Sequence, residues 1–420
     1  LGDVYKRQKF FNVTEEFSTF SSFSWVFVLS LPHIGTKETD MGAIKRTMQS
    51  EIEKRIRSQK VMLLFGARRV GKTVLLRQIV DGWQKGKTLL LNGESMDTTR
   101  ILENKTTANY RRMFSGISLL AIDEAQHIPD IGMKLKFIVD ELSDIAVIAT
   151  GSSSFELHNQ AGEPLVGRST QFMLTPLSEK EISSEENNFE IMVNTDHRLI
   201  YGHYPELLSL DSDQEKKEYL EDVVDAYLLR DILMVDGVKH SQKIHDLLRL
   251  IAWQVGSEVS LDELGRQLSL SRNTVERYLD LLQKVFVIYR LGGFSRNLRK
   301  EVSKASKWYF QDNGIRNAVL RDFRPYNERT EVERGALWEN FIISERMKRS
   351  LNHRMGLKFY FWRTYNNQEI DLIEENGQDI EAFEIKAGKK TPKVPRPFAE
   401  GYPDAPFSYI NRENYLDFIL

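Results

Sequence analysis

Gly66-Ala-Arg-Arg-Val-Gly-Lys-Thr73 matches the pattern GxxxxGK[ST]. It follows an apolar run over residues 61–65, which is typical of a buried strand, and it leads into a helical pattern over residues 72–83. The glycines allow backbone amides to turn inward around phosphate groups, and the N-terminus of the helix adds positive partial charge. The sequence therefore predicts a phosphate-binding loop (P-loop) between a strand and a helix.

The residue types in this loop suit the binding of ATP and Mg²⁺. We expect Lys72 to reach the β- and γ-phosphates and to act in hydrolysis, and Thr73 to be a ligand of Mg²⁺. The alternative is a chance glycine-lysine turn, which the order of strand, loop and helix disfavours. The residues expected to contact the nucleotide are Gly66, Ala67, Arg68, Arg69, Val70, Gly71, Lys72 and Thr73.

A second motif, Leu119-Leu-Ala-Ile-Asp-Glu124, is an apolar strand that ends in two acids and fits a Walker B element. Ligands of open α/β sheets bind at the carboxyl ends of the strands, so both carboxylates are expected near the phosphates. Asp123 would hold Mg²⁺ through water, and Glu124 would polarise the attacking water as the catalytic acceptor. The alternative is an ordinary acidic helix start after a strand. The two motifs together predict ATP hydrolysis.

Two further positions are candidates for contact with the nucleotide. Ile148-Ala-Thr-Gly-Ser-Ser153 ends the next apolar run with hydroxyl groups. Ser152 either senses the γ-phosphate or caps a helix for structural reasons alone. Arg168 either stabilises charge on the phosphates or is an ordinary surface arginine. These alternatives stay open.

Apolar runs alternate with helical patterns from Met41 to about residue 175, as a parallel sheet with crossover helices requires. The further strand-like runs lie at 88–91, 117–122 and 145–150. We therefore expect an α/β fold with a P-loop ATPase core at 41–175. Helical periodicity then predicts a helical lid at 176–240.

Residues 241–315 have the pattern of a winged helix-turn-helix. Ser260-Leu-Asp-Glu263 is a capping box that starts a short helix, and Ser271 caps a second helix after a sharp turn. Gly292-Gly293 and the basic stretch that follows favour a wing hairpin.

The second helix of such a unit can read base edges, and nearby cations can meet phosphates. The base-reading candidates are Arg272, Asn273, Thr274 and Arg277. The phosphate-contacting candidates are Arg290, Arg296, Arg299, Lys300, Lys304 and Lys307. Glu276 and Asp280 dilute this charge, and winged helices also serve as packing or protein-contact modules. DNA binding through residues 260–307 and protein contact are both kept as hypotheses.

Residues 330–420 predict a separate α/β module with a helix and three strand-like runs. Glu339 lies on the helix, Asp371 ends one run, and Glu384 and Lys386 share one face of a later strand. An Asp with a Glu can share a divalent ion while a lysine stabilises attack on a phosphodiester. We expect Asp371, Glu384 and Glu339 as metal ligands and Lys386 as a catalytic residue. The alternative is a two-sided polar strand.

The composition limits the class of protein. The 420 residues are 41% hydrophobic and 28% charged, which is typical of globular domains. The net charge of −2 gives no global attraction to nucleic acid or lipid, so such binding needs a local patch. There is no cysteine, which excludes disulfides and thiolate metal sites and favours the cytoplasm. No apolar run reaches the ~18 residues of a membrane helix, so no membrane partner is expected.

The first forty residues contain no recognisable motif. Asp3-Val-Tyr-Lys-Arg-Gln8 resembles a frame translation of the transposon end used to build sequencing libraries. We therefore expect residues 1–40 to be non-native read-through without ordered structure. The native start is then Met41, with Met48 as the alternative.

From Met41 onward, nearly the whole chain resembles a large group of bacterial and archaeal AAA-type ATPases that carry a C-terminal domain of unknown function. The matching motifs are the P-loop, Ile122-Asp-Glu-Ala125, Thr150-Gly-Ser-Ser153, Gly167-Arg168, Tyr201-Gly-His-Tyr-Pro-Glu206, Arg230-Asp231 and Lys307-Trp-Tyr-Phe-Gln-Asp312. The resemblance implies a Walker B strand beside the P-loop strand, a winged helix, and a terminal PD-(D/E)XK domain, which is restriction-endonuclease-like. Glu339, Asp371, Glu384 and Lys386 fall on the nuclease pattern, although Ile370 stands where that pattern has proline.

Two hypotheses about function follow. In the first, ATP hydrolysis is coupled to DNA binding or processing, with the C-terminal module as an Mg²⁺-dependent nuclease. In the second, nucleotide state controls a DNA- or protein-binding switch, and the nuclease-like fold is an inactive scaffold. Oligomerisation is compatible with both hypotheses.

Overall fold

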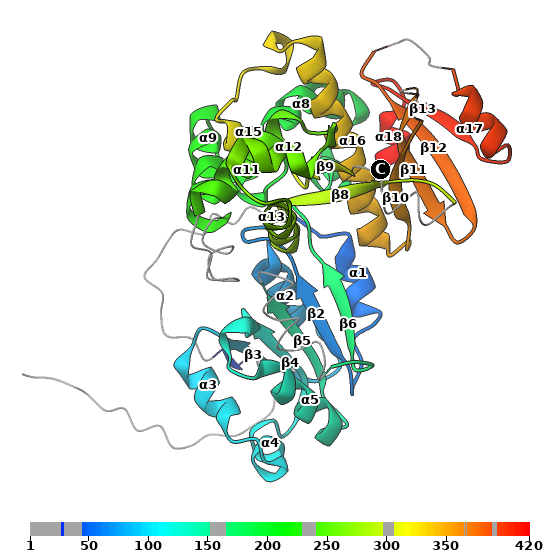
Figure 1. Cartoon of the computed structure of the whole chain (residues 1–420). Coiled ribbons are helices and arrows are strands. Elements are labelled where there is room, and N and C mark those ends of the chain that lie inside the picture. Colours follow the sequence, from blue (N-terminus) through cyan, green and yellow to red (C-terminus); the bar gives the residue numbers. More distant parts are fainter. Residues whose placement is uncertain are drawn as a thin grey trace, which may run out of the picture.

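The computed structural model describes residues 27–28, 44–151, 165–228, 241–296, 306–364, 366, 368–388 and 393–420. Two sheets with helices packed around them make up this part of the chain (Figure 1). Of the first forty residues only Phe27 and Val28 are described, and they pair in parallel with a strand of the first sheet. The expectation of non-native read-through stays a prediction.

The first sheet is parallel throughout, as expected for an α/β core. Its order is β1-β3-β4-β5-β2-β6. Its strands are β1 (Phe27–Val28), β2 (Val61–Phe65), β3 (Lys87–Asn92), β4 (Ile117–Asp123), β5 (Ala146–Gly151) and β6 (Ser169–Met173). One implication of the family resemblance is wrong: β5 separates the Walker B strand β4 from the P-loop strand β2. The motifs themselves carry no information about which strand inserts between them.

Helices cover both faces of this sheet, which explains why its strands read as continuous apolar runs. Leu119 and Ala121 of β4 belong to a core shared with α2, whereas Leu120 and Ile122 belong to a core shared with α5. The helices of this part are α1 (Met48–Glu53), α2 (Lys72–Asp81), α3 (Met96–Glu103), α4 (Thr107–Met113) and α5 (Ile131–Glu141).

The segment after β6 is helical, as its periodicity predicts. It contains α7 (Glu179–Ile182), α8 (Asn188–Tyr201), α9 (Asp213–Asp222) and the π-helix η4 (Val223–Leu228). Both α8 and α9 pack against α15 (Asn313–Leu320). The turn around Glu206 contacts the P-loop through an ion pair with Arg69. A lid function for residues 176–240 stays a prediction.

The helix-turn-helix pattern forms two short capped helices, α12 (Leu261–Leu268) and α13 (Arg272–Lys284), which follow α11 (Ser241–Trp253). Ser260 Oγ accepts from the backbone amide of Glu263, and Ser271 Oγ accepts from that of Thr274. Next come the antiparallel strands β8 (Ile288–Gly293) and β9 (Ser306–Phe310). The predicted wing residues 297–305 lie outside the described residues.

The sheet of the C-terminal region continues that of the preceding region, and the domain boundary at residue 330 stays a prediction. The order is β13-β12-β11-β10-β8-β9-β7, and β8 pairs in parallel with β10 at Tyr360↔Gly292 and Phe361↔Gly293. The remaining strands are β7 (Glu258–Val259), β10 (Lys358–Arg363), β11 (Glu369–Asn376), β12 (Asp379–Ile385) and β13 (Phe407–Ile410). Pairing with β10 satisfies backbone groups that β8 would otherwise present at an open edge.

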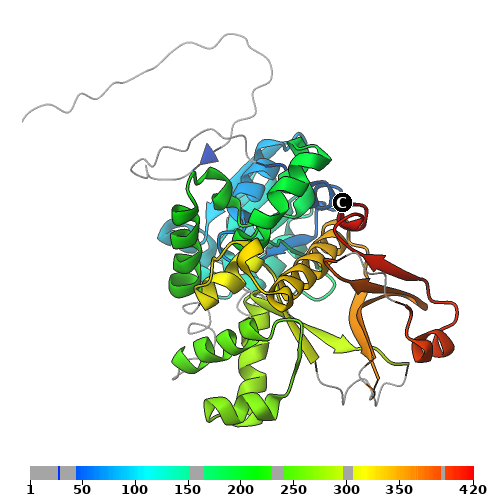
Figure 2. The same ribbon diagram turned by 90° about the horizontal axis from the view of Figure 1, so that it is seen from above.

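The long helix α16 (Glu331–His353) contacts both halves of the molecule. It packs against α1 and α8 on one side and against β9 and β12 on the other. Figure 2 shows it running between the N-terminal body and the second sheet. Two short helices, α17 (Arg396–Gly401) and α18 (Tyr415–Ile419), complete the C-terminal region. Within the described ranges, no helix is both long and apolar enough to span a bilayer.

Candidate functional site

The P-loop lies between β2 and α2, in the order that the sequence predicts. Gly71 has a φ of 94°, a left-handed conformation that favours glycine, and α2 begins at Lys72. A Cβ atom at Gly66 would lie 2.3 Å from the carbonyl oxygen of Leu174, so only glycine fits there. Lys72 Nζ donates to the carbonyl oxygens of Gly66 and Ala67 at 3.0 and 2.8 Å. The ammonium group is thus held at the P-loop, where it is expected to bind phosphates.

Other residues of the loop are fixed by different contacts. Val70 is fully buried, and Arg68 is half-buried. Arg69 has a φ of 66° and forms an ion pair with Glu206 at 3.2 Å. The motif from Tyr201 to Glu206 therefore reaches the P-loop from a distant part of the sequence.

Asp123 is the centre of a hydrogen-bond chain at the carboxyl edge of the first sheet. Thr73 Oγ1 donates to Asp123 Oδ2 at 2.7 Å, and Thr150 Oγ1 donates to Asp123 Oδ1 at 2.5 Å. The same hydroxyl of Thr150 accepts from the backbone amide of Glu124 at 3.0 Å. Hydroxyl and carboxylate oxygens are the ligands that Mg²⁺ prefers, so Thr73 and Asp123 fit the ion expected beside the phosphates.

Glu124 stands next to this chain in an unusual backbone conformation. Its φ of 47° and ψ of 45° are left-handed, which is uncommon for a residue other than glycine. A Cβ at Gly93 on the neighbouring segment would lie 2.3 Å from the carbonyl oxygen of Glu124. The side chain of Glu124 accepts from Gln126 Nε2 at 2.5 Å. Such strained positions are common at functional sites, which makes Glu124 the natural candidate acceptor.

The other two nucleotide candidates are not part of this constellation. Ser152 lies outside the described residues. Arg168 forms an ion pair with Asp140 at 2.6 Å, and its carbonyl oxygen accepts from the amide of Val61 at the start of β2. The P-loop follows the other end of β2, about 16 Å away along five residues. Arg168 therefore does not reach phosphates bound at this chain's own P-loop, because strand direction puts it at the opposite edge of the sheet.

The structure brings the four predicted nuclease residues into one region. Lys386 Nζ lies 2.8 Å from Asp371 Oδ2 and 3.0 Å from Glu384 Oε1, and the amide of Ile385 also donates to Asp371. Glu339 of α16 adds its charge to the same region, where it affects the pKa of Lys386. Lysine and acids thus form ion pairs at the end of β12.

No site role was predicted for Tyr309 or Glu369 of this region, and Lys307 was predicted to contact phosphate. Lys307 is instead buried, with Nζ 3.5 Å from Glu339 and in an ion pair with Glu369. Tyr309 donates to Glu339 Oε1 at 2.6 Å. A Lys-x-Tyr alternation on β9 was the available signal, but nothing local indicates that this strand lies beside α16. We call Lys307, Glu339, Glu369, Asp371, Glu384 and Lys386 the C-terminal charged cluster.

Burial and neighbouring charges shift the protonation of this cluster. Burial raises the pKa of Glu339 to about 7; Lys307 opposes this shift, and Asp371 adds to it. Burial lowers the pKa of Lys386, but Asp371 and Glu384 outweigh that effect and the net pKa is raised. Among the residues that the structure describes, no three His, Asp or Glu side chains are arranged to hold a metal ion. The four carboxyl groups of the cluster share two ammonium groups: Lys386 contacts Asp371 and Glu384, and Lys307 contacts Glu339 and Glu369. The arrangement is an ion-pair network in which acids outnumber lysines, and its role as a metal centre stays a prediction.

The helix-turn-helix presents a groove whose charge is balanced. The groove measures about 960 Å³ and lies between α13 and the sheet residues Arg290, Trp308 and Tyr360. Its charged lining residues are Arg272, Arg277, Arg290, Asp262, Glu276 and Asp280. Arg272 is also paired with Asp262 at 3.0 Å. Among the lining residues that the structure describes, three cations and three anions therefore balance.

Three family models match consecutive parts of the chain. Residues 58–183 match one described as an AAA domain. Residues 192–325 and 334–414 match two that are described as domains of unknown function, DUF8612 and DUF4143. The AAA match contains the P-loop, Asp123, Glu124 and Thr150.

The chain is also similar to proteins from bacteria and an archaeon. An uncharacterized protein of Mycobacterium tuberculosis is 26% identical over 358 residues, covering 84% of this chain and 76% of that protein. One from Haemophilus influenzae is 24% identical, with coverages of 77% and 83%. One from Methanocaldococcus jannaschii is 23% identical, with coverages of 78% and 75%. Together with the AAA match, these similarities support an AAA-type ATPase that binds nucleotide.

Proposed function

We propose that this protein is an Mg²⁺-dependent ATPase whose nucleotide site is formed by the P-loop, Asp123, Glu124 and Thr150. The chain from Thr73 through Asp123 to Thr150 is the observation that carries the proposal. It joins the start of α2 to the ends of two central strands. A bound Mg²⁺ supplies positive charge to the phosphates at this position.

The side chains divide the work of hydrolysis. Lys72 leaves the loop carbonyls and pairs with the β- and γ-phosphates, where negative charge develops during transfer. Thr150 holds the carboxylate of Asp123 and the amide of Glu124 in fixed positions. Glu124 orients the attacking water and accepts its proton. The amides of the P-loop and the N-terminus of α2 bind the phosphate oxygens.

We further propose that nucleotide state controls the binding of a partner through the helix-turn-helix, and that the C-terminal region is a scaffold. The lysine-paired acids of the C-terminal charged cluster support this version over metal-dependent cutting. Among the described lining residues of the groove beside α13, balanced charge supports a protein partner over a long phosphate backbone. DNA binding or processing is the alternative function.

An ATP hydrolysis assay on the purified chain tests these proposals. We expect turnover with Mg²⁺, none after EDTA is added in excess, and turnover at least about 100-fold slower for Lys72→Ala. The assay is repeated with single-stranded and double-stranded DNA, with a gel that detects cut products. Stimulation of ATP turnover by either DNA, or cutting of either DNA, supports the alternative function. Absence of both turnover and nucleotide binding refutes the ATPase proposal.

A further inference from the structure

A buried set of charged side chains connects the P-loop to helix α16. At its first end is Arg46, which is 4% exposed. Its Nη1 donates to the carbonyl oxygen of Val70 in the P-loop, and its Nη2 donates to that of Thr175 after β6, both at 2.8 Å. Its Nε lies 3.2 Å from Glu181 Oε1. One guanidinium group therefore braces the P-loop against the start of α7.

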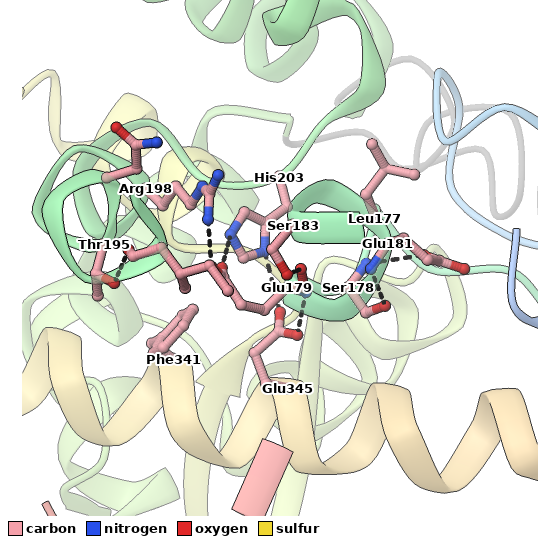
Figure 3. Close-up of polar contacts among 12 residues, drawn as sticks. Leu177, Ser178, Glu179, Glu181, Ser183, Thr195, Arg198, His203, Phe341 and Glu345 are labelled. Carbon is pink, nitrogen blue, oxygen red and sulfur yellow. Dashed lines mark hydrogen bonds and ion pairs between the residues drawn. The ribbon is translucent and has the colours of Figure 1, made fainter. Parts of the chain in front are cut away.

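The short turn at α7 carries the connection onward. Glu181 accepts from the amides of Thr47 and Ser178, at 2.7 and 2.9 Å, and so fixes both chain segments around Arg46. The next residue after Ser178 is Glu179, whose amide donates to Glu345 Oε2 on α16 at 2.7 Å. Figure 3 shows Glu345 directed from α16 toward this turn and toward His203.

His203 bridges the two carboxylates from the other side. Its Nδ1 lies 3.0 Å from Glu345 Oε1 and its Nε2 lies 3.1 Å from Glu179 Oε2. Lys348 donates to Glu345 at 2.6 Å and to the carbonyl oxygen of Leu177 at 2.9 Å. Three residues beyond His203, Glu206 pairs with Arg69 of the P-loop. Two routes thus link the P-loop to the same glutamate of α16.

Each charge in this network lies beside an opposite charge, so the loss of one affects its neighbours. Burial raises the pKa of Glu345, but Lys348 and His203 outweigh burial and lower it to about 2. Burial and Lys348 lower the pKa of His203, but the carboxylates of Glu345 and Glu179 outweigh them and the net pKa is raised. Removing one partner from a buried ion pair leaves the other charge uncompensated, which is costly.

We infer that Glu345 is a positioning residue for the P-loop and acts through Glu179, His203 and the Arg46–Glu181 pair. The inference rests on the proposed nucleotide site and extends it to a helix outside the AAA match. By thermodynamic linkage, nucleotide bound at the P-loop stabilises the position of α16 to the same degree. Glu339 of the C-terminal charged cluster lies six residues earlier on this helix, about 9 Å along its axis. Nucleotide state therefore reaches the second sheet through α16.

The test compares Glu345→Gln with Glu374→Gln. Glu374 is also buried and also pairs with α16, through Arg346 at 2.6 Å, but it lies on β11 of the second sheet. We measure the Kd of a fluorescent, non-hydrolysable ATP analogue with Mg²⁺, and the KM and kcat of ATP hydrolysis. Glu345→Gln should raise Kd and KM by about fivefold or more, the low end of typical coupling between sites. Glu374→Gln should leave both within about twofold, a change smaller than that coupling.

Arg46 provides a second pair of variants. Arg46→Met should weaken nucleotide binding as Glu345→Gln does, and Arg46→Lys should restore part of the loss. Lysine keeps the charge opposite Glu181 but cannot span both carbonyl oxygens as guanidinium does. Equal affinities for Arg46→Met and the wild type would overturn the inference.

Amide hydrogen exchange of the wild-type protein needs no substitution and applies even if a variant does not fold. Adding the analogue with Mg²⁺ should slow exchange in residues 177–182 and 341–349 as well as in the P-loop. Protection confined to the P-loop and α2 would overturn the inference about Glu345 but would leave the proposed nucleotide site standing. If the wild-type protein binds no analogue at all, the proposed nucleotide site and the inference both fall.

Discussion

The two charged sites of this molecule use similar side chains in opposite electrostatic settings. At the nucleotide site, the carboxylate of Asp123 accepts from the neutral hydroxyls of Thr73 and Thr150. In the C-terminal charged cluster, the carboxylates of Asp371 and Glu369 pair with ammonium groups. A hydroxyl donates a hydrogen bond without adding charge, whereas a lysine offsets part of the charge of the carboxylate that it contacts. The two sites therefore differ in the charge of the groups that contact their carboxylates, and a metal site at the C-terminal charged cluster stays a prediction.

The largest expected effect separates the two lysines. Lys72→Ala should reduce kcat for ATP hydrolysis by at least about 100-fold, because it removes a charge that acts where negative charge develops. Lys386→Ala should leave ATP turnover unchanged, because this lysine pairs with acids of the second sheet. Both rates are measured with saturating Mg²⁺. Similar rates for Lys72→Ala and the wild type would remove the distinction between the sites.

A smaller effect is expected for Asp371→Asn. Asp371 is 3% exposed and bonds to Lys386 and to the amide of Ile385. Its loss should lower the free energy of unfolding by about 1–3 kcal/mol in urea denaturation, as for other disrupted buried polar contacts. Calorimetry with Mn²⁺ and no nucleotide should detect no ion bound at this cluster in the wild type. Metal binding together with DNA cutting, both lost in Asp371→Asn, would instead support the nuclease hypothesis.

Opposite pH dependences are expected from two glutamates of α16. The pKa of Glu345 is lowered to about 2, so its contribution to stability is present above its ordinary value of 4.5 and is lost as pH falls toward 2. The pKa of Glu339 is raised to about 7, so its contribution is present below 4.5 and is lost as pH rises through 7. Urea denaturation across this range provides the test. Glu339→Gln should flatten the decline between pH 4.5 and 7, and an unchanged slope would contradict the assigned shift.

The smallest effect concerns a helix cap far from both sites. Ser271→Ala removes the hydrogen bond to the amide of Thr274 and should cost about 1 kcal/mol of unfolding free energy. Basal ATP turnover should not change. If α13 contacts the partner, binding of that partner should weaken along with the helix. A change in basal turnover would show that this region is coupled to the P-loop more tightly than we propose.

Features that depend on residues close together in the sequence were predicted best. The P-loop, the acids at the end of β4 and the capped helices α12 and α13 depend on spacing over a few positions, and all these elements form where expected. The position of β5 between β4 and β2 depends on strand pairing, which local patterns do not specify.

Contacts between distant segments were not predictable in the same way. Lys307 was predicted to be a basic surface residue because no local sequence pattern shows that β9 packs beside α16. Arg46 precedes the first helix and gave no sign that it contacts Val70 and Thr175. Arg168 is near the P-loop strand in space but at its opposite end, a difference that depends on strand direction. Contacts were thus hard to predict because their residues lie far apart in the sequence, and not because of the residue types involved.

The most direct test of the central claim is the behaviour of Glu124→Gln at the nucleotide site. Glutamine keeps the shape of the side chain but cannot accept the proton of the attacking water. We predict that this variant binds ATP with Mg²⁺ as tightly as the wild type and hydrolyses it at least about 100-fold more slowly, the low end for loss of a general base. Single-turnover measurement of ATP cleavage separates this chemical step from product release. A wild-type cleavage rate in Glu124→Gln would contradict the assignment of this site as the hydrolytic centre.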